Sequence, residues 1–103
     1  MAQRPKGFWY LDSAEEFYKK DSSSVIPSRK FRENMKVGEY AKLIFVMYEP
    51  SPGCQSERMW VEVTDRLKSG YCGTIKSNPA FLKDILPGEK VAFGPEHVCE
   101  ISR

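Results

Sequence analysis

Short apolar and polar segments alternate along the chain, and in its C-terminal half this pattern predicts a compact β unit. Residues 57–63 and 70–75 have the composition and alternation of strands, and residues 78–85 are typical of a helical turn. Residues 88–93 and 97–101 then predict two further strands. Short strands joined by tight connections in this order are typical of small curled sheets and barrels.

The N-terminal region predicts one apolar segment and one helix. Residues 8–11 form an apolar cluster, which fits either an edge strand or a flap over the core. Ser13 and Glu16 have the spacing of a capping box, in which each side chain satisfies a free backbone amide of the first turn. The helix is expected to run to about Lys20, with Phe17 facing inward.

A second short helix is predicted to begin at Ser28, with Phe31 and Met35 on its inward face at i, i+4 spacing. Residues 40–48 follow as a long strand that is apolar on both faces. Such a strand is normally central, because it must be covered from both sides.

The chain nearly repeats itself. The motif Phe31-x-x-x-Met35-x-x-Gly38-Glu39 precedes one strand, and Phe81-x-x-x-Ile85-x-x-Gly88-Glu89 precedes another. In both places we expect a helical turn that buries two apolar side chains. The glycine is then expected to adopt a left-handed conformation, cap the helix and turn the chain into a strand.

These elements predict an α+β fold: a strongly bent antiparallel sheet or small SH3-like β-barrel of about five strands, with an N-terminal helix and short helical turns. The 103 residues fit a single domain spanning 1–103, with an N-terminal helical segment (1–24) and a β-rich core (25–103). The predicted core consists of Phe17, Phe31, Met35, Leu43, Phe45, Val61, Val63, Ile75, Phe81, Ile85, Val91, Phe93 and Ile101.

Composition and charge narrow the classes of function. The chain is 41% hydrophobic and carries a net charge of +2, which argues against duplex DNA or an anionic membrane as partner. The longest apolar run, 43–48, is far too short to span a membrane, and residues 1–25 contain no signal-peptide core. Three cysteines, an odd number, fit a reducing compartment. We therefore expect a cytoplasmic protein.

Several segments resemble a known family. Residues 37–45, 57–63 (Glu-Arg-Met-Trp-Val-Glu-Val), 73–79, 87–93 and 97–98 are similar to the bacterial domain-of-unknown-function family 2314, over about residues 25–101. The resemblance implies a small bacterial protein without an established activity, in some members beside repeat domains or near toxin–immunity genes. Residues 71–73 and 77–79 depart from the family pattern, and the lysine-rich N-terminal helix lies outside it. No catalytic residue follows from this resemblance.

The cysteines and the single histidine do not have the spacing of a metal or catalytic site. His97 and Cys99 are the only close pair, whereas zinc sites usually present paired ligands on a tight knuckle, and Cys72 would have to arrive from elsewhere. Cys54 has no activating neighbour in the sequence. We predict no metal, no cofactor and no catalytic residue, and we interpret Cys72 and Cys99 as core residues.

One segment concentrates basic residues around an aromatic side chain, a combination that can bind single-stranded nucleic acid. Because Phe31 lies in the inward register, a solvated helix face is the favoured interpretation. The candidate residues for nucleic acid are Arg29, Lys30, Arg32, Lys36 and Lys42.

The strand at 57–63 places one tryptophan opposite the core. Alternation turns Met59, Val61 and Val63 inward, so Trp60 lies on the other face among charged neighbours. The sequence favours its being covered by the N-terminal segment. An exposed Trp60 would instead be an anchor for a partner.

The first functional hypothesis is a non-enzymatic protein-interaction module, of the immunity or accessory kind that the resemblance suggests. Its partner would be another protein of unknown identity. A single-stranded nucleic-acid-binding barrel is the alternative, and a small-ligand or cysteine-dependent enzyme the second alternative. The proline-containing segment 49–56 is expected to be an exposed loop that shares in binding. The candidate partner-binding residues are Tyr48, Pro52, Arg58, Trp60 and Glu62.

Overall fold

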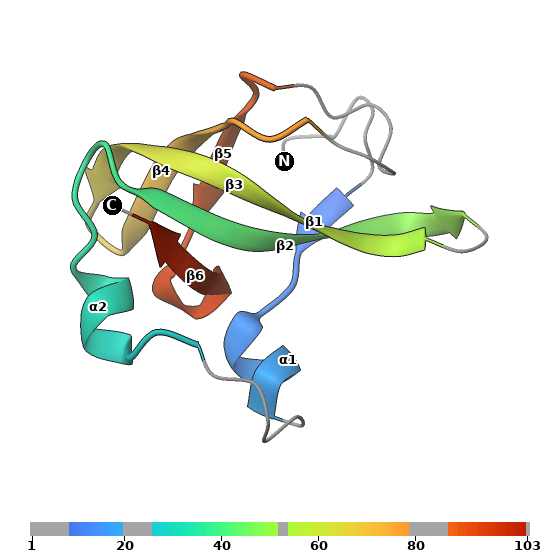
Figure 1. The fold of residues 1–103 in the computed structure, drawn as a ribbon, viewed down its shortest axis with the longest axis horizontal. Helices are drawn as coiled ribbons and strands as arrows, with labels where there is room; N and C mark the ends of the chain where they lie inside the picture. The colour runs from blue at the N-terminus through green and yellow to red at the C-terminus, as the bar shows by residue number, and fades with distance from the viewer. Residues whose placement is uncertain (1–8, 20–25, 52–53, 79–86, 103) are drawn as a thin grey trace.

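The computed structural model describes residues 9–19, 26–51, 54–78 and 87–102. Most of the described chain is strand, with two short helices near the N-terminal end (Figure 1). The elements are β1 (Trp9–Leu11), α1 (Ala14–Lys19), α2 (Arg29–Glu33), β2 (Tyr40–Ser51), β3 (Cys54–Leu67), β4 (Gly70–Ile75), β5 (Lys90–Phe93), a 3₁₀ turn (Pro95–His97) and β6 (Val98–Ser102).

The strands form one antiparallel sheet in the order β1-β2-β3-β4-β5, and β6 pairs with β2. Strand β3 pairs with one edge of β2 along residues 40–46 of β2. The other edge of β2 is shared by two strands, because β6 pairs with residues 40–43 and β1 with residues 45–47. The sheet therefore curls back on itself into a nearly closed small barrel, as Figure 1 shows. This confirms the predicted fold class and the central position of the strand at 40–48. Residues 8–11 were expected as an edge strand or a flap, and the described part is the edge strand β1.

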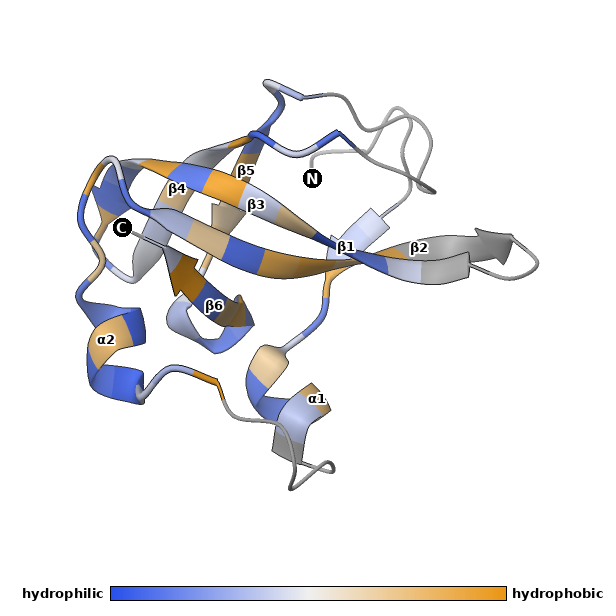
Figure 2. Cartoon of the chain, in the orientation of Figure 1, coloured by the Kyte–Doolittle hydropathy of each residue, from blue (hydrophilic) through white to orange (hydrophobic). Residues whose placement is uncertain are grey.

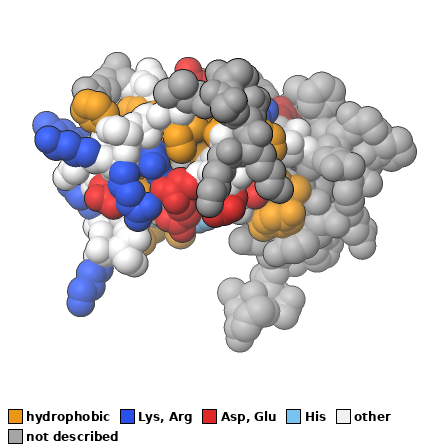
Figure 3. All heavy atoms as spheres, turned by 90° about the horizontal axis from the view of Figure 1, so that it is seen from below, with side chains coloured by type: hydrophobic (Ala, Val, Ile, Leu, Met, Phe, Trp, Pro, Cys, Tyr) orange, Lys and Arg blue, Asp and Glu red, His pale blue; other side chains and the backbone are white. Residues whose placement is uncertain are grey.

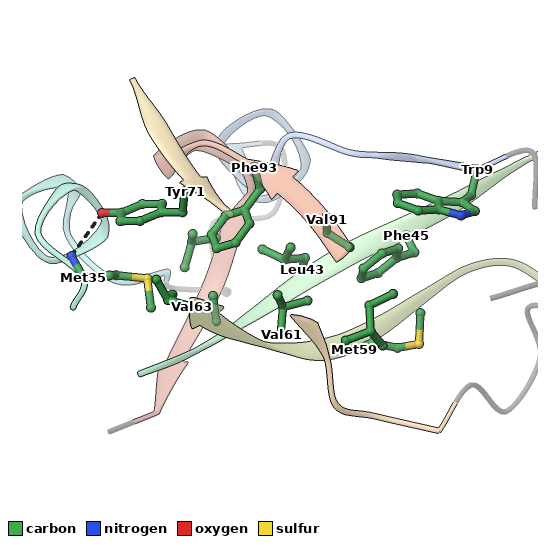
Figure 4. Packing of buried hydrophobic residues seen from close by; sticks show 13 residues of the cluster. Trp9, Met35, Leu43, Phe45, Met59, Val61, Val63, Tyr71, Val91 and Phe93 are labelled. Carbon is green, nitrogen blue, oxygen red and sulfur yellow. Dashed lines mark hydrogen bonds between the residues drawn. The ribbon is translucent and has the colours of Figure 1, made fainter. Parts of the chain in front are cut away.

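Alternation along the strands builds the interior of the barrel. Apolar and polar residues alternate along β3, whereas the middle of β2 is apolar on both faces (Figure 2). Leu43, Val61 and Ile75 are fully buried, and Trp9 of β1 stacks against Phe45 with the ring centroids 5.0 Å apart. Figure 4 shows Leu43, Val61, Trp9 and Phe45 meeting in the interior from different strands. Pairing shifts after Val63 and after Lys42 mark irregularities of the kind that bend strands around a barrel.

Tyr71 fastens the end of α2 to the barrel. Its hydroxyl donates to the Arg32 carbonyl oxygen (2.7 Å) and accepts from the Met35 amide (3.0 Å; Figure 4). Helix α2 begins as predicted at Ser28, whose hydroxyl accepts from the Phe31 amide. The helix ends at Glu33, so Gly38 does not cap it. Gly38 lies instead in a separate turn that leads into β2.

A second, smaller cluster lies outside the barrel, beneath α1. Ala14 of α1 packs with Ile44 of β2 and Cys99 of β6, with Tyr18 against them. The predicted N-cap is confirmed, because the Ser13 hydroxyl accepts from the Glu16 amide at 3.2 Å. Helix α1 therefore covers part of the outer face of β2 and β6.

The prediction that Phe17 and Phe31 belong to the core is wrong. Phe17 is 42% exposed and Phe31 is 52% exposed. Both helices are little longer than one turn, so each has room for few inward positions. Ala14 takes that role in α1 and Arg32 in α2.

The expected loop at 49–56 is also wrong, because β2 continues to Ser51 and β3 begins at Cys54, with these two residues paired. The two strands extend past the barrel as a long hairpin (Figure 1). The helical turn predicted at 78–85, with Phe81 and Ile85, falls almost wholly outside the described residues.

Candidate functional site

The outer face of the sheet next to α1 carries a half-buried tryptophan. Cross-strand pairing sets Lys42 of β2 beside Trp60 of β3 on one side and Glu100 of β6 on the other. A hollow of about 310 Å³ opens at the tryptophan. We call this surface the Trp60 face; the hollow is lined by Tyr40, Trp60, Lys76, Ser77 and Ser102, and Lys42 adjoins it.

The cations of the Trp60 face are paired. The Lys42 ammonium lies 4.9 Å from the centroid of the Trp60 ring and 3.1 Å from a Glu100 carboxylate oxygen. Lys76 lies 3.3 Å from a carboxylate oxygen of Glu62. The face is therefore an aromatic centre with a polar rim of nearly balanced charge, which is the usual anatomy of a protein-binding surface.

Backbone contacts hold the Trp60 face in shape. The Trp60 amide donates to the Ser77 hydroxyl (2.8 Å), and the Trp60 carbonyl accepts from the Lys76 amide (2.9 Å). The residues that follow β4 are thereby fixed to β3. The hollow is therefore lined by three strand residues and by Lys76 and Ser77, which these bonds hold against β3.

Arg58, two residues before Trp60, has a structural role that the sequence did not reveal. Its Nε donates to the Tyr18 hydroxyl at 2.9 Å, and its guanidinium lies 5.2 Å from the centroid of the Phe17 ring. Arg58 therefore links α1 to β3 while its side chain stays exposed.

The expected cover over Trp60 is not supplied by the described N-terminal elements. Trp9 points into the barrel against Phe45, and α1 lies over Ile44 and Cys99. Within the described chain, the N-terminal segment thus covers the neighbouring half of this outer face. Trp60 itself remains half-buried.

The other candidate partner-binding residues divide between two regions. Glu62 lies on the Trp60 face through its pair with Lys76. Tyr48 belongs to the projecting hairpin, six residues along β2 from Lys42 and hence about 20 Å away. The Tyr48 side chain and Pro52 fall outside the described part of the structure.

The basic segment does not form one surface. Arg32 is only 6% exposed and binds Glu15, and Arg29 bridges Glu15 and Glu33. Lys42 lies on the Trp60 face, whereas Lys30 and Lys36 are exposed near α2. In the view from below, basic and acidic side chains lie next to one another (Figure 3).

These ion pairs also shift the pKa values of Glu15 and Arg29. The hydrogen bond from Arg32 lowers the pKa of the Glu15 carboxyl, and the hydrogen bond to Glu33 raises the pKa of Arg29. The expectation of a solvated basic helix face is therefore wrong for Arg32, whose charge is buried and paired.

The cysteine and histidine candidates lie in separate surroundings. Cys99 is 7% exposed, its thiol donates to the Lys42 carbonyl oxygen at 3.0 Å, and burial raises its pKa to about 11. His97 belongs to the 3₁₀ turn, where its Nδ1 accepts from the Gly94 amide. Cys72 is partly buried, and the Cys54 side chain is not described. Cys99 is thus a poor nucleophile at neutral pH.

Of the residues of the Trp60 face, the sequence analysis named Trp60 and Glu62 as candidates for a partner and Lys42 as a candidate for nucleic acid; it did not name Tyr40, Lys76, Ser77 or Ser102. The signal for Tyr40 and Lys42 was present, since alternation in β2 turns both away from Leu43. Ser102 required knowledge of the pairing of β6 with β2 across more than fifty residues, and Lys76 required knowledge that the chain after β4 bonds to Trp60 of β3.

Comparison of the chain with known protein families, curated proteins and solved structures finds no match. Among the described residues, no helix is long and apolar enough to cross a membrane. The resemblance to family 2314 and the cytoplasmic location stay predictions from the sequence.

Proposed function

We propose that the chain is a non-enzymatic interaction module that binds a partner protein through the Trp60 face. The observation that carries the proposal is the half-buried Trp60 beside a hollow of about 310 Å³, on a sheet face whose other half is covered by α1. Tryptophan is among the residues that most often dominate binding energy at protein interfaces.

The charge distribution favours a protein over a nucleic acid as partner. Lys42 and Lys76 already have carboxylate partners, so few cations on this face remain to neutralise phosphates. The complementary surface would insert an apolar side chain into the hollow. Its polar groups would face the two lysine–glutamate pairs.

The test is a pull-down of tagged protein from native lysate, with and without nuclease, read by mass spectrometry. Trp60→Ala removes the proposed anchor, and Lys76→Glu reverses a rim charge without touching the core. Leu67→Ala is the matched control, because Leu67 is 48% exposed on β3 but does not line the hollow.

The proposal expects one stoichiometric, nuclease-resistant partner that the wild type and Leu67→Ala both retain. With purified partner, Trp60→Ala should weaken binding by about thirtyfold or more, which corresponds to ~2 kcal/mol. A partner that Trp60→Ala and Lys76→Glu retain undiminished would contradict this site. Recovery that nuclease abolishes would favour the nucleic-acid alternative.

A further inference from the structure

A second groove lies away from the Trp60 face, where α2, the β3–β4 hairpin and the 3₁₀ turn meet. Its volume is about 340 Å³, and it is lined by residues that include Arg66, Lys68 and Ser69 on the hairpin and Glu33 and Glu96 opposite. A cavity of this size matches small ligands.

The acidic groups of the groove are already engaged. Glu33 accepts from the Arg29 guanidinium at 2.5 Å. Glu96 lies 3.7 Å from the His97 imidazole, and its charge helps to raise the pKa of Arg29. Both carboxylates thus lie against residues of their own wall, and neither forms an ion pair with the hairpin cations among the described residues.

The two cations of the β3–β4 hairpin, Arg66 and Lys68, differ from Arg29 in their ion pairing. Within the described ranges, neither Arg66 nor Lys68 makes an ion pair, although both line the groove. The groove thus has two carboxylates and Arg29 on one wall, and two cations without a carboxylate partner among the described residues on the other.

Arg66 is also held in place. One of its terminal nitrogens donates to the Glu33 carbonyl oxygen (3.2 Å), and its guanidinium lies 5.9 Å from the centroid of the Tyr71 ring. A guanidinium has five N–H donors, so most remain for a ligand. Its planar fork suits two oxygens of a carboxylate or phosphate.

We propose that this groove binds the oxyanion group, carboxylate or phosphate, of a small ligand, with Arg66 as the fork and Lys68 as the second cation. The Ser69 hydroxyl supplies a further donor beside them. The site is separate from the Trp60 face and does not depend on the function proposed there.

The experiment titrates ¹⁵N-labelled protein with sodium phosphate and, separately, with sodium acetate, against sodium chloride at equal ionic strength. The Arg66 Nε–Hε resonance, assigned from the spectrum of Arg66→Gln, reports contact directly. We expect saturable shifts of this signal and of the Ser69 and Gly70 amides. The dissociation constant should be on the order of 1 mM, as expected of a small probe with two charge-assisted hydrogen bonds.

Arg66→Gln should weaken the binding about tenfold or more, and Lys68→Gln should weaken it severalfold. Lys68→Gln changes only an exposed turn and so guards against a folding defect in the first variant. Lys90→Gln, on β5 outside the groove, is the control and should bind as the wild type does.

Saturation by phosphate alone would identify a phosphate group as the ligand chemistry, and saturation by acetate alone a carboxylate. Shifts that fail to saturate, that chloride reproduces, or that persist unchanged in Lys68→Gln and Arg66→Gln would overturn the proposal.

Discussion

At the scale of single residues, Arg32 shows how a basic residue becomes structural. It is the only charged side chain among the buried residues described, and it joins three parts of the chain. Its Nε donates to the Pro27 carbonyl oxygen (2.7 Å). One of its two terminal nitrogens donates both to the Pro95 carbonyl oxygen (2.9 Å) and to a Glu15 carboxylate oxygen (2.5 Å). Arg32 therefore joins α1, α2 and the 3₁₀ turn, and its buried guanidinium has a structural role.

Arg32→Ala is predicted to destabilise the protein by about 2–4 kcal/mol, because it leaves the Pro27 and Pro95 carbonyls without their charged donor and leaves Glu15 with Arg29 alone. Arg29→Ala is the matched control: Arg29 binds the same Glu15, but from an exposed position where water replaces it. Urea unfolding of both variants measures the difference. Equal midpoints for Arg29→Ala and Arg32→Ala would show that the Arg32 network contributes no more than a surface pair.

At the scale of elements, the repeated Gly-Glu motif makes the same turn twice. Gly38 and Gly88 both have φ of +97°. In the first turn, the Gly38 amide donates to the Val63 carbonyl oxygen, and the Val63 amide donates to the Glu39 carbonyl oxygen. In the second, the Gly88 amide donates to the Ile75 carbonyl oxygen, and the Ile75 amide donates to the Glu89 carbonyl oxygen. Each turn thus aligns a new strand with a buried residue of the barrel.

Gly38→Ala and Gly88→Ala are each predicted to cost about 1–2 kcal/mol of unfolding free energy. A Cβ atom at either position would meet nothing within 4 Å, so the cost would come from the backbone conformation alone. Val37→Ala, in the same turn and 61% exposed, should change stability by less than about 0.5 kcal/mol. Thermal or urea unfolding checks this. A Gly38→Ala variant as stable as Val37→Ala would mean that the turn relaxes freely.

The elements also show where sequence reasoning succeeded and where it stopped. Strand β4 has the predicted bounds, and alternation in β3 turned Val61 inward and Trp60 outward as expected. Short helices gave poorer predictions, because one turn of helix has no reliable periodicity; Phe31 was assigned to the core in place of Arg32. The prolines at 50 and 52 suggest a loop in the sequence, yet Pro50 lies within β2, where the projecting hairpin tolerates a proline.

At the scale of the whole molecule, the barrel is not fully closed. Among the described strands, β5 pairs only with β4, while β1 and β6 each pair only with β2. A hollow of about 280 Å³ lies along this seam, lined by Trp9, Tyr10 and Leu11 on one side and Lys90, Val91 and Ala92 on the other. The seam thus lies between two strands that are each paired on one edge, β1 and β5, whereas β2, β3 and β4 have neighbours on both edges.

This asymmetry predicts how the molecule opens. Amides of β2 and β3, such as those of Leu43 and Val61, should exchange with solvent only through global unfolding, because both strands are paired on two edges around fully buried residues. Amides of β5 and β1 should exchange through local opening at the seam, with a lower free energy. Native-state hydrogen exchange followed by NMR over a range of low urea concentrations separates the two classes, since only the first depends steeply on urea. If the β5 amides exchanged as slowly as those of β2 and with the same urea dependence, the seam would be closed in solution, and the barrel would open as one cooperative unit.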